Sequence, residues 1–138
     1  MRGKEVFKHA VQKLVSCIEI SLKKNKLKKK YAVWVISNTT EAHIKSLQSQ
    51  FVFLNSFNGL VTSERAGFHK PHPNIFKFAL EEANTDAVSS IFIDDSYSNV
   101  ESAENLGFIS HHYIEFDKLM KFFQLFKINF SAISKPLS

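Results

Sequence analysis

Apolar residues recur along the chain at two different spacings, which predict alternating helices and strands. The continuous apolar run 32–36 is typical of a strand covered on both faces of a parallel sheet. One stripe at helical spacing predicts a helix over about residues 4–24: Phe7, Val11, Leu14, Ile18 and Leu22. The same patterns predict helices near 41–51, 75–83, 100–107 and 116–127, and strands near 59–62, 90–93 and 108–114. Gly67, Pro71 and Pro73 predict a loop over 63–73.

Strands that alternate with helices predict an α/β fold with a mostly parallel sheet, because right-handed crossovers join parallel strands. A chain of 138 residues, 44% of them hydrophobic, is large enough for one core without disulfides. We expect an N-terminal helix and basic linker over 1–30, the α/β core over 31–128 and a tail over 129–138. The lone Cys17 excludes an internal disulfide and favours a reducing, cytoplasmic setting.

The net charge of +5 comes from one cluster: Lys23, Lys24, Lys26, Lys28, Lys29 and Lys30. Without these six lysines, 12 basic residues face 13 acidic ones, so the rest of the chain is electrostatically ordinary. A solvated helix end explains the cluster better than a phosphate or nucleic-acid patch, because no aromatic residue is interleaved with it. No apolar run is long enough for a membrane span or a signal sequence, so we expect no membrane partner. Because the basic cluster is one local feature and not a basic face, we also expect no nucleic-acid partner.

Polar residues follow two of the predicted strands, at the ends where parallel sheets place their ligands. Ser37 and Asn38 follow the first strand, and Asp94 and Asp95 follow the strand at 90–93. Two adjacent carboxylates are costly to desolvate unless a cation such as Mg²⁺ neutralises them. Equally, Asp94 could cap the next helix with Asp95 in solvent, and a lone loop lysine such as Lys70 is more often solvated than functional.

Three stretches in this order are more specific than their single residues: VWVISNT at 33–39, GFHKPHPNIF at 67–76 and IFIDDSYSNV at 91–100. Together they strongly resemble the second, third and fourth motifs of the haloacid dehalogenase (HAD) superfamily, over roughly residues 20–115. The resemblance implies a three-layer, Rossmann-like core and a Mg²⁺-dependent site for a small phosphorylated substrate.

The resemblance also implies a role for each matching residue. The Ser37 side chain and the Asn38 amide would bind phosphoryl oxygens, and Lys70 would offset their charge. Asp94 would bind the metal, and Asp95 would assist directly or through water. Asn99 would help to shape the loop between them.

The chain departs from the family at the first motif, an Asp-x-Asp on the central strand whose first carboxylate attacks phosphorus. Before Ser37 the only carboxylates are Glu5 and Glu19, both in the predicted first helix. We therefore expect a truncated or degenerate phosphatase-type hydrolase without turnover of its own. The alternative is a non-catalytic module that binds phosphate or a protein.

The lost strand would lie between the strands at 32–36 and 90–93. These two strands could then pair directly, be complemented by another chain or self-associate, or receive the N-terminal segment, which its helical pattern disfavours.

Overall fold

The structure is a computed structural model that describes residues 31–125. Residues 32–115 form one compact unit. The last described helix, α6 (Phe116–Leu125), belongs to a second unit and is treated by itself. The helix expected over 4–24 and the lysine cluster lie outside the described residues.

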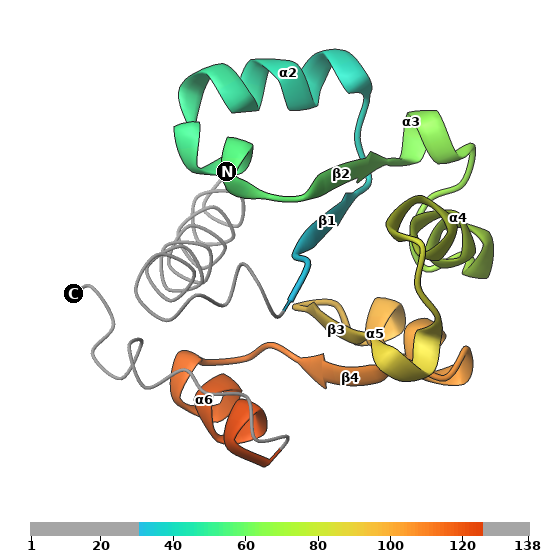
Figure 1. Ribbon diagram of the computed structural model, residues 1–138, viewed down its shortest axis with the longest axis vertical. Coiled ribbons are helices and arrows are strands. Elements are labelled where there is room, and N and C mark those ends of the chain that lie inside the picture. The colour runs from blue at the N-terminus through green and yellow to red at the C-terminus, as the bar shows by residue number, and fades with distance from the viewer. Residues whose placement is uncertain (1–30, 126–138) are drawn as a thin grey trace. The chain divides into compact units, whose positions relative to one another are not determined.

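Four short strands form two parallel pairs, which confirms the α/β class expected from the sequence (Figure 1). Strand β1 (Trp34–Ser37) pairs with β2 (Gly59–Thr62), and Ser37 lies opposite Thr62. Strand β3 (Ile91–Asp94) pairs with β4 (Ile109–His112), and Asp94 lies opposite His112. Within residues 31–125, β1 pairs only with β2 and β3 only with β4, so direct pairing of β1 with β3 does not occur there.

The helices of this unit begin and end where local sequence dictates. They are α2 (Glu41–Gln50), α4 (Pro73–Ala83) and α5 (Tyr97–Asn105), with the 3-10 turns η2 (Val52–Ser56) and η3 (Ala87–Ser89) between them. Thr40 caps α2, because its hydroxyl accepts a hydrogen bond of 3.1 Å from the His43 N–H. Asn84 ends α4 in the left-handed conformation, with φ 53°.

The loop predicted over 63–73 is partly wrong, since its first four residues form the one-turn helix α3 (Ser63–Ala66). The Thr62 hydroxyl caps this turn by accepting from the Arg65 N–H at 3.1 Å. Gly67 then ends it at φ 82°, a conformation that glycine adopts without steric cost. The rest of the segment, up to the start of α4, is loop as predicted.

The core of the 32–115 unit joins both strand pairs to α4 and α5. Its buried members are Val61, Ile75, Phe76, Ala79, Phe92, Val100, Ala103 and Phe108. Three of these rings, Phe76, Phe92 and Phe108, meet edge to face with centroids 5.0 to 6.2 Å apart. The phenylalanine-rich sequence therefore serves packing in this unit.

Close packing also explains a glycine in β2. Gly59 lies opposite Trp34 in the β1–β2 register. A Cβ atom at position 59 would overlap the indole ring of Trp34. The site therefore requires a residue without a side chain.

Helix α6 confirms the phenylalanine-rich helix expected near 116–127. Its residues Phe116, Leu119 and Phe123 are buried, at the spacing of one helical face. Among residues 31–125, no helix is both long and apolar enough to cross a bilayer.

Candidate functional site

The candidate site centres on an ion pair between residues far apart in sequence. Asp94 is the last residue of β3, and Lys70 lies in the loop between α3 and α4. The Lys70 Nζ atom lies 2.8 Å from Asp94 Oδ2. Their side chains are only 12% and 8% exposed, so this pair is largely desolvated. Lys70 is therefore not the solvated loop lysine that its residue type alone favours.

Two further donors hold the Asp94 carboxylate. The Ser96 N–H donates to Oδ1 at 2.8 Å, and the Asn99 side-chain amide donates to Oδ2 at 3.2 Å. Burial raises the pKa of the Asp94 carboxyl, but the charge and hydrogen bond of Lys70, with the hydrogen bonds of the Ser96 N–H and Asp95, outweigh it and bring the pKa below its ordinary value. Asp94 is thus held in its ionised form, as a metal ligand requires.

Asp95 next to it behaves in the opposite way. Burial, followed by the hydrogen bond and negative charge of Asp94, raises the pKa of the Asp95 carboxyl. Its backbone carbonyl lies 2.8 Å from the His112 Nε2 atom, which ties the acidic loop to the end of β4. Two neighbouring carboxylates whose pKa values move apart are typical of a cation or proton-handling site.

The loop that carries Lys70 is fixed from two sides. The Lys70 N–H donates to Asn38 Oδ1 at 2.7 Å, and Asn38 Nδ2 donates to the Lys70 carbonyl at 3.1 Å. From α5, the Ser102 hydroxyl donates to the Pro71 carbonyl at 2.5 Å. Ser37 ends β1 immediately before Asn38. These hydrogen bonds tie the loop of Lys70 to the end of β1 and to α5, and the Lys70–Asp94 ion pair ties it to the end of β3.

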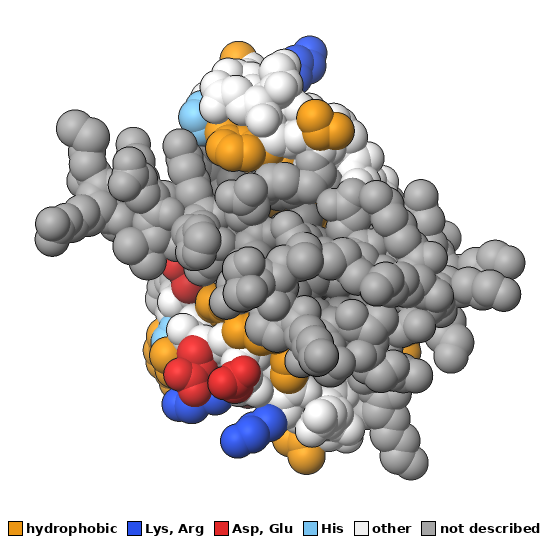
Figure 2. Space-filling view, turned by 90° about the vertical axis from the view of Figure 1, so that its left-hand side faces the viewer, with side chains coloured by type: hydrophobic (Ala, Val, Ile, Leu, Met, Phe, Trp, Pro, Cys, Tyr) orange, Lys and Arg blue, Asp and Glu red, His pale blue; other side chains and the backbone are white. Residues whose placement is uncertain are grey.

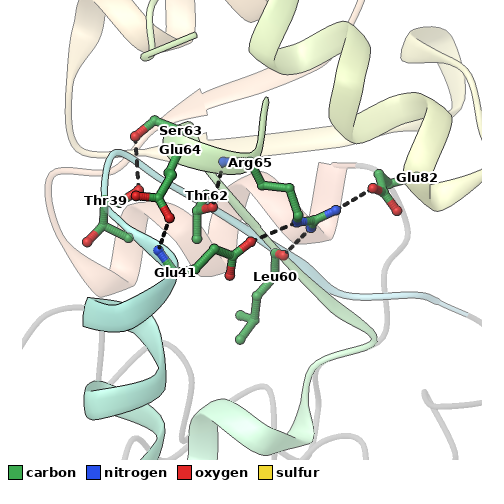
Figure 3. A network of polar contacts seen from close by, with 8 residues as sticks. All are labelled: Thr39, Glu41, Leu60, Thr62, Ser63, Glu64, Arg65 and Glu82. Carbon is green, nitrogen blue, oxygen red and sulfur yellow. Dashed lines mark hydrogen bonds and ion pairs between the residues drawn. The ribbon is translucent and has the colours of Figure 1, made fainter. Parts of the chain in front are cut away.

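A second polar network, which the sequence did not suggest, surrounds Arg65 in α3 (Figure 3). The Arg65 guanidinium contacts Glu41 of α2 at 3.0 Å, Glu82 of α4, and the Leu60 carbonyl at 2.6 Å. The Thr39 carbonyl accepts from the Ser63 hydroxyl at 3.1 Å and from the Glu64 N–H at 3.2 Å. Glu41 and Glu82 lie on two predicted helices and Arg65 lies in the segment predicted as a loop, and no spacing along the chain pairs them.

The donor set of the acidic loop fits Mg²⁺. Among residues 31–125, no group of three or more His, Cys, Asp or Glu side chains could hold a metal. Mg²⁺ does not need one, because it usually takes one or two carboxylates and fills its other positions with water and phosphate oxygens. Asp94 and Asp95 are therefore the residues that would hold it.

Side chains of both charges lie on one face of the described residues. Figure 2 shows acidic and basic side chains close together on one face of the described residues, with hydrophobic side chains beside them.

Curated relatives match part of the chain. A sesquiterpene phosphatase of Aspergillus oryzae is 27% identical over 81 residues, which cover 59% of this chain and 41% of the relative. The D-ribitol-5-phosphate phosphatase of Bacteroides thetaiotaomicron is 32% identical over 88 residues, which cover 59% and 43%. The chain thus spans less than half the length of these relatives.

Solved structures share the fold. A HAD family enzyme from Bacteroides thetaiotaomicron, an aspartate-to-alanine mutant in complex with magnesium and inorganic phosphate, is 31% identical with a TM-score of 0.57. That match covers 68% of this chain and 53% of the enzyme. An uncharacterised protein from Corynebacterium glutamicum has a TM-score of 0.63 at 22% identity, with 83% and 81% covered, and shows the fold alone.

The family assignment rests on most of the chain. The sequence profile of haloacid dehalogenase-like hydrolases matches residues 4–111, which include all three stretches that resemble the family's motifs. The chain belongs to the haloacid dehalogenase-like hydrolases.

Proposed function

We propose that this chain carries a phosphatase-type site that binds Mg²⁺ and the phosphoryl group of a small phosphate monoester. Asp94 and Asp95 would hold the metal. Ser37, the Asn38 N–H and Lys70 would bind the phosphoryl oxygens. The observation that carries the proposal is the buried ion pair between Lys70 and Asp94, 2.8 Å long. This ion pair brings together Lys70, which would bind phosphate, and Asp94, which would bind the metal.

Each residue has a defined task in such a site. Phosphoryl transfer depends mostly on positioning and on neutralising charge. Mg²⁺, when bound, would neutralise the charge of the phosphoryl oxygens and help to orient the phosphoryl group. The Lys70 ammonium would add a second positive charge, and Asn99 would keep the Asp94 carboxylate turned toward the metal.

The named relatives support this class of substrate. Two of them are phosphatases by name, for a sesquiterpene and for D-ribitol 5-phosphate, and one related enzyme is in complex with both magnesium and inorganic phosphate. All these substrates share a phosphate group, and the site residues of this chain would contact that group alone. We therefore propose phosphate monoesters as the class of substrate, and the site residues do not distinguish one leaving group from another.

We further propose that the 138-residue chain binds these ligands without turnover. Its sequence contains no Asp-x-Asp, and before Ser37 its only carboxylates are Glu5 and Glu19. Covalent catalysis needs a nucleophile placed beside the phosphorus atom, and no group of the proposed site supplies one.

Calorimetric titration of the full chain with Mg²⁺, and then with inorganic phosphate, tests the proposal. We expect phosphate to bind only with Mg²⁺ present. The variant Asp94→Asn should abolish both events, and Glu104→Gln, an exposed carboxylate of α5, should change neither. Absence of any binding by the wild-type chain would overturn the site.

A parallel assay with p-nitrophenyl phosphate tests the lack of turnover. We expect no product above the buffer rate. Mg²⁺-dependent turnover that Asp94→Asn removes would refute the non-catalytic part of the proposal and require a nucleophile elsewhere in the chain.

A further inference from the structure

Both polar atoms of the Asn38 side chain bind the backbone of one residue, Lys70. Oδ1 accepts from the Lys70 N–H at 2.7 Å, and Nδ2 donates to the Lys70 carbonyl at 3.1 Å. We propose that Asn38 acts through its side chain as a positioning residue, which fixes the backbone of Lys70 so that its ammonium reaches Asp94 and the phosphoryl group. This inference rests on the proposed function, and it adds to the phosphate-binding role of the Asn38 N–H.

A lysine side chain needs a fixed backbone if its ammonium group is to occupy one position. A lysine side chain is a compact charge on a flexible four-carbon stem, so its position depends on how firmly its backbone is held. Lys70 lies in a loop, with no helix or strand to hold it. Asn38 supplies the two hydrogen bonds that a neighbouring strand would otherwise give to one residue.

A second contact supports the same conclusion from the other side. The Ser102 hydroxyl donates to the carbonyl of Pro71, the next residue, at 2.5 Å. Consecutive residues of the loop are thus tied to the end of β1 and to α5. The Lys70 side chain then spans the remaining distance to Asp94, with its Nζ atom 2.8 Å from Oδ2.

The test compares Asn38→Ala with Lys70→Met and with the double variant, by calorimetric titration of the full chain with inorganic phosphate in excess Mg²⁺. We expect Asn38→Ala to weaken phosphate binding about tenfold, which corresponds to one hydrogen bond to a charged group. In the Lys70→Met background, Asn38→Ala should have no further effect, because its action runs through the ammonium. A full tenfold effect in that background would overturn the proposal.

A matched control removes a similar hydrogen bond at the opposite end of the same strand. Asn58 Oδ1 accepts from the N–H of Val33, just before β1, at 2.8 Å. Asn58→Ala should leave phosphate affinity within about twofold of wild type, the scatter expected for independent sites. An equal loss in Asn58→Ala would show that a general weakening of the strand explains the effect, and would overturn the proposal.

A readout without phosphate separates this inference from the proposed function. In ¹⁵N spectra at low temperature, the Lys70 ammonium should give a slowly exchanging signal that persists in Asn58→Ala and disappears in Asn38→Ala. If wild-type protein binds no phosphate but the signal behaves in this way, the proposed function fails and the positioning role stands. An unchanged signal in folded Asn38→Ala overturns the positioning role.

If Asn38→Ala fails to fold, Asn38→Asp replaces it. Aspartate has nearly the same shape and keeps the acceptor for the Lys70 N–H, but it loses the donor to the Lys70 carbonyl. We expect hydrogen exchange at the Lys70 amide to stay slow while the ammonium signal weakens. Full retention of that signal would show that the second hydrogen bond has no positioning role.

Discussion

The Lys70 ammonium lies 2.8 Å from the Asp94 carboxylate, on the oxygen that Asn99 also contacts. A Mg²⁺ ion held by Asp94 would therefore share that carboxylate with another cation. In the proposed site, Lys70 would oppose metal binding by its charge and would favour phosphate binding by the same charge. Removal of the Lys70 charge should therefore change the affinities for Mg²⁺ and for phosphate in opposite directions, which removal of a purely structural salt bridge would not do.

The variant Lys70→Met should separate the two effects. Mg²⁺ alone should bind more tightly, because a competing cation is gone, whereas phosphate should bind about tenfold more weakly in excess Mg²⁺. Calorimetric titration measures both. Lys77→Met, an exposed lysine of α4, serves as control and should change neither affinity. Parallel losses of both affinities would contradict the opposition.

The same variant should lower stability in the absence of metal. Removing one partner of a buried ion pair leaves the other charge uncompensated, at a cost of about 3 kcal/mol. Urea unfolding in the presence of a chelator measures this loss. Saturating Mg²⁺ should restore much of it in Lys70→Met, since the metal would neutralise Asp94.

Gly59→Ala should destabilise the β1–β2 pair. Its Cβ would overlap the Trp34 ring, and overpacking of this kind costs about 1 to 3 kcal/mol. Urea unfolding measures the loss. In the background of Trp34→Leu, which makes room, the added cost of Gly59→Ala should become small. An equal cost in both backgrounds would mean that the ring is not the cause.

Stability should depend on pH through His111. Burial, followed by the charge of His112, lowers the pKa of His111 below its ordinary value of 6.5. The unfolded chain therefore takes up the proton first, so the free energy of unfolding should fall as pH drops below 6.5 and level off below the folded pKa. Urea unfolding across this range should show a flatter profile for His111→Gln. An unchanged profile would exclude His111 as the source.

Replacing Arg65 should loosen α3. Its guanidinium joins α2, α4 and the Leu60 carbonyl, and its side chain is 36% exposed, so we expect a loss of only about 1 kcal/mol in Arg65→Met. Arg65→Lys should lose nearly as much, because an ammonium cannot reproduce the planar fork. Thermal unfolding of the two variants compares them. Full retention of stability in Arg65→Lys would show that charge alone matters.

Self-association is the last prediction. Within residues 31–125, β1 and β3 each pair along one edge, and apolar edges that stay unpaired recruit further strands. We expect light scattering of the purified chain to reveal oligomers that grow with concentration, and thermal melting to occur at low temperature. A monodisperse monomer with a cooperative melt at high temperature would contradict this.

Patterns within short segments predicted the elements well. The apolar run at 32–36 became β1 at Trp34–Ser37, and the strand at 59–62 kept its bounds as β2. The ends of the elements shifted by one to three residues, because caps and strand pairing fix them. The turn α3 was missed because Gly67 and Pro71 indicated a loop, although the threonine that caps it was visible in the sequence.

The site was less accessible to sequence reasoning. Asp94 and Lys70 are 24 residues apart, and only the resemblance to a family suggested that they act together. The contacts of the Asn38 side chain and the partners of Arg65 depend on rotamers and on the packing of helices, which no spacing along the chain encodes. Sequence patterns therefore identified the residues, whereas their contacts depend on how distant segments pack in the folded chain.

The edge-to-face rings of Phe76, Phe92 and Phe108 also matter for the site. Phe92 lies two residues before Asp94, and Phe76 belongs to the helix that begins three residues after Lys70. The ring contact of 5.0 Å between Phe76 and Phe92 thus acts as a spacer for the two charges. A change of ring size at Phe76 or Phe92 would therefore alter the distance between Lys70 and Asp94 from within the core. A core substitution at either of these two rings should therefore change phosphate affinity as well as the free energy of unfolding.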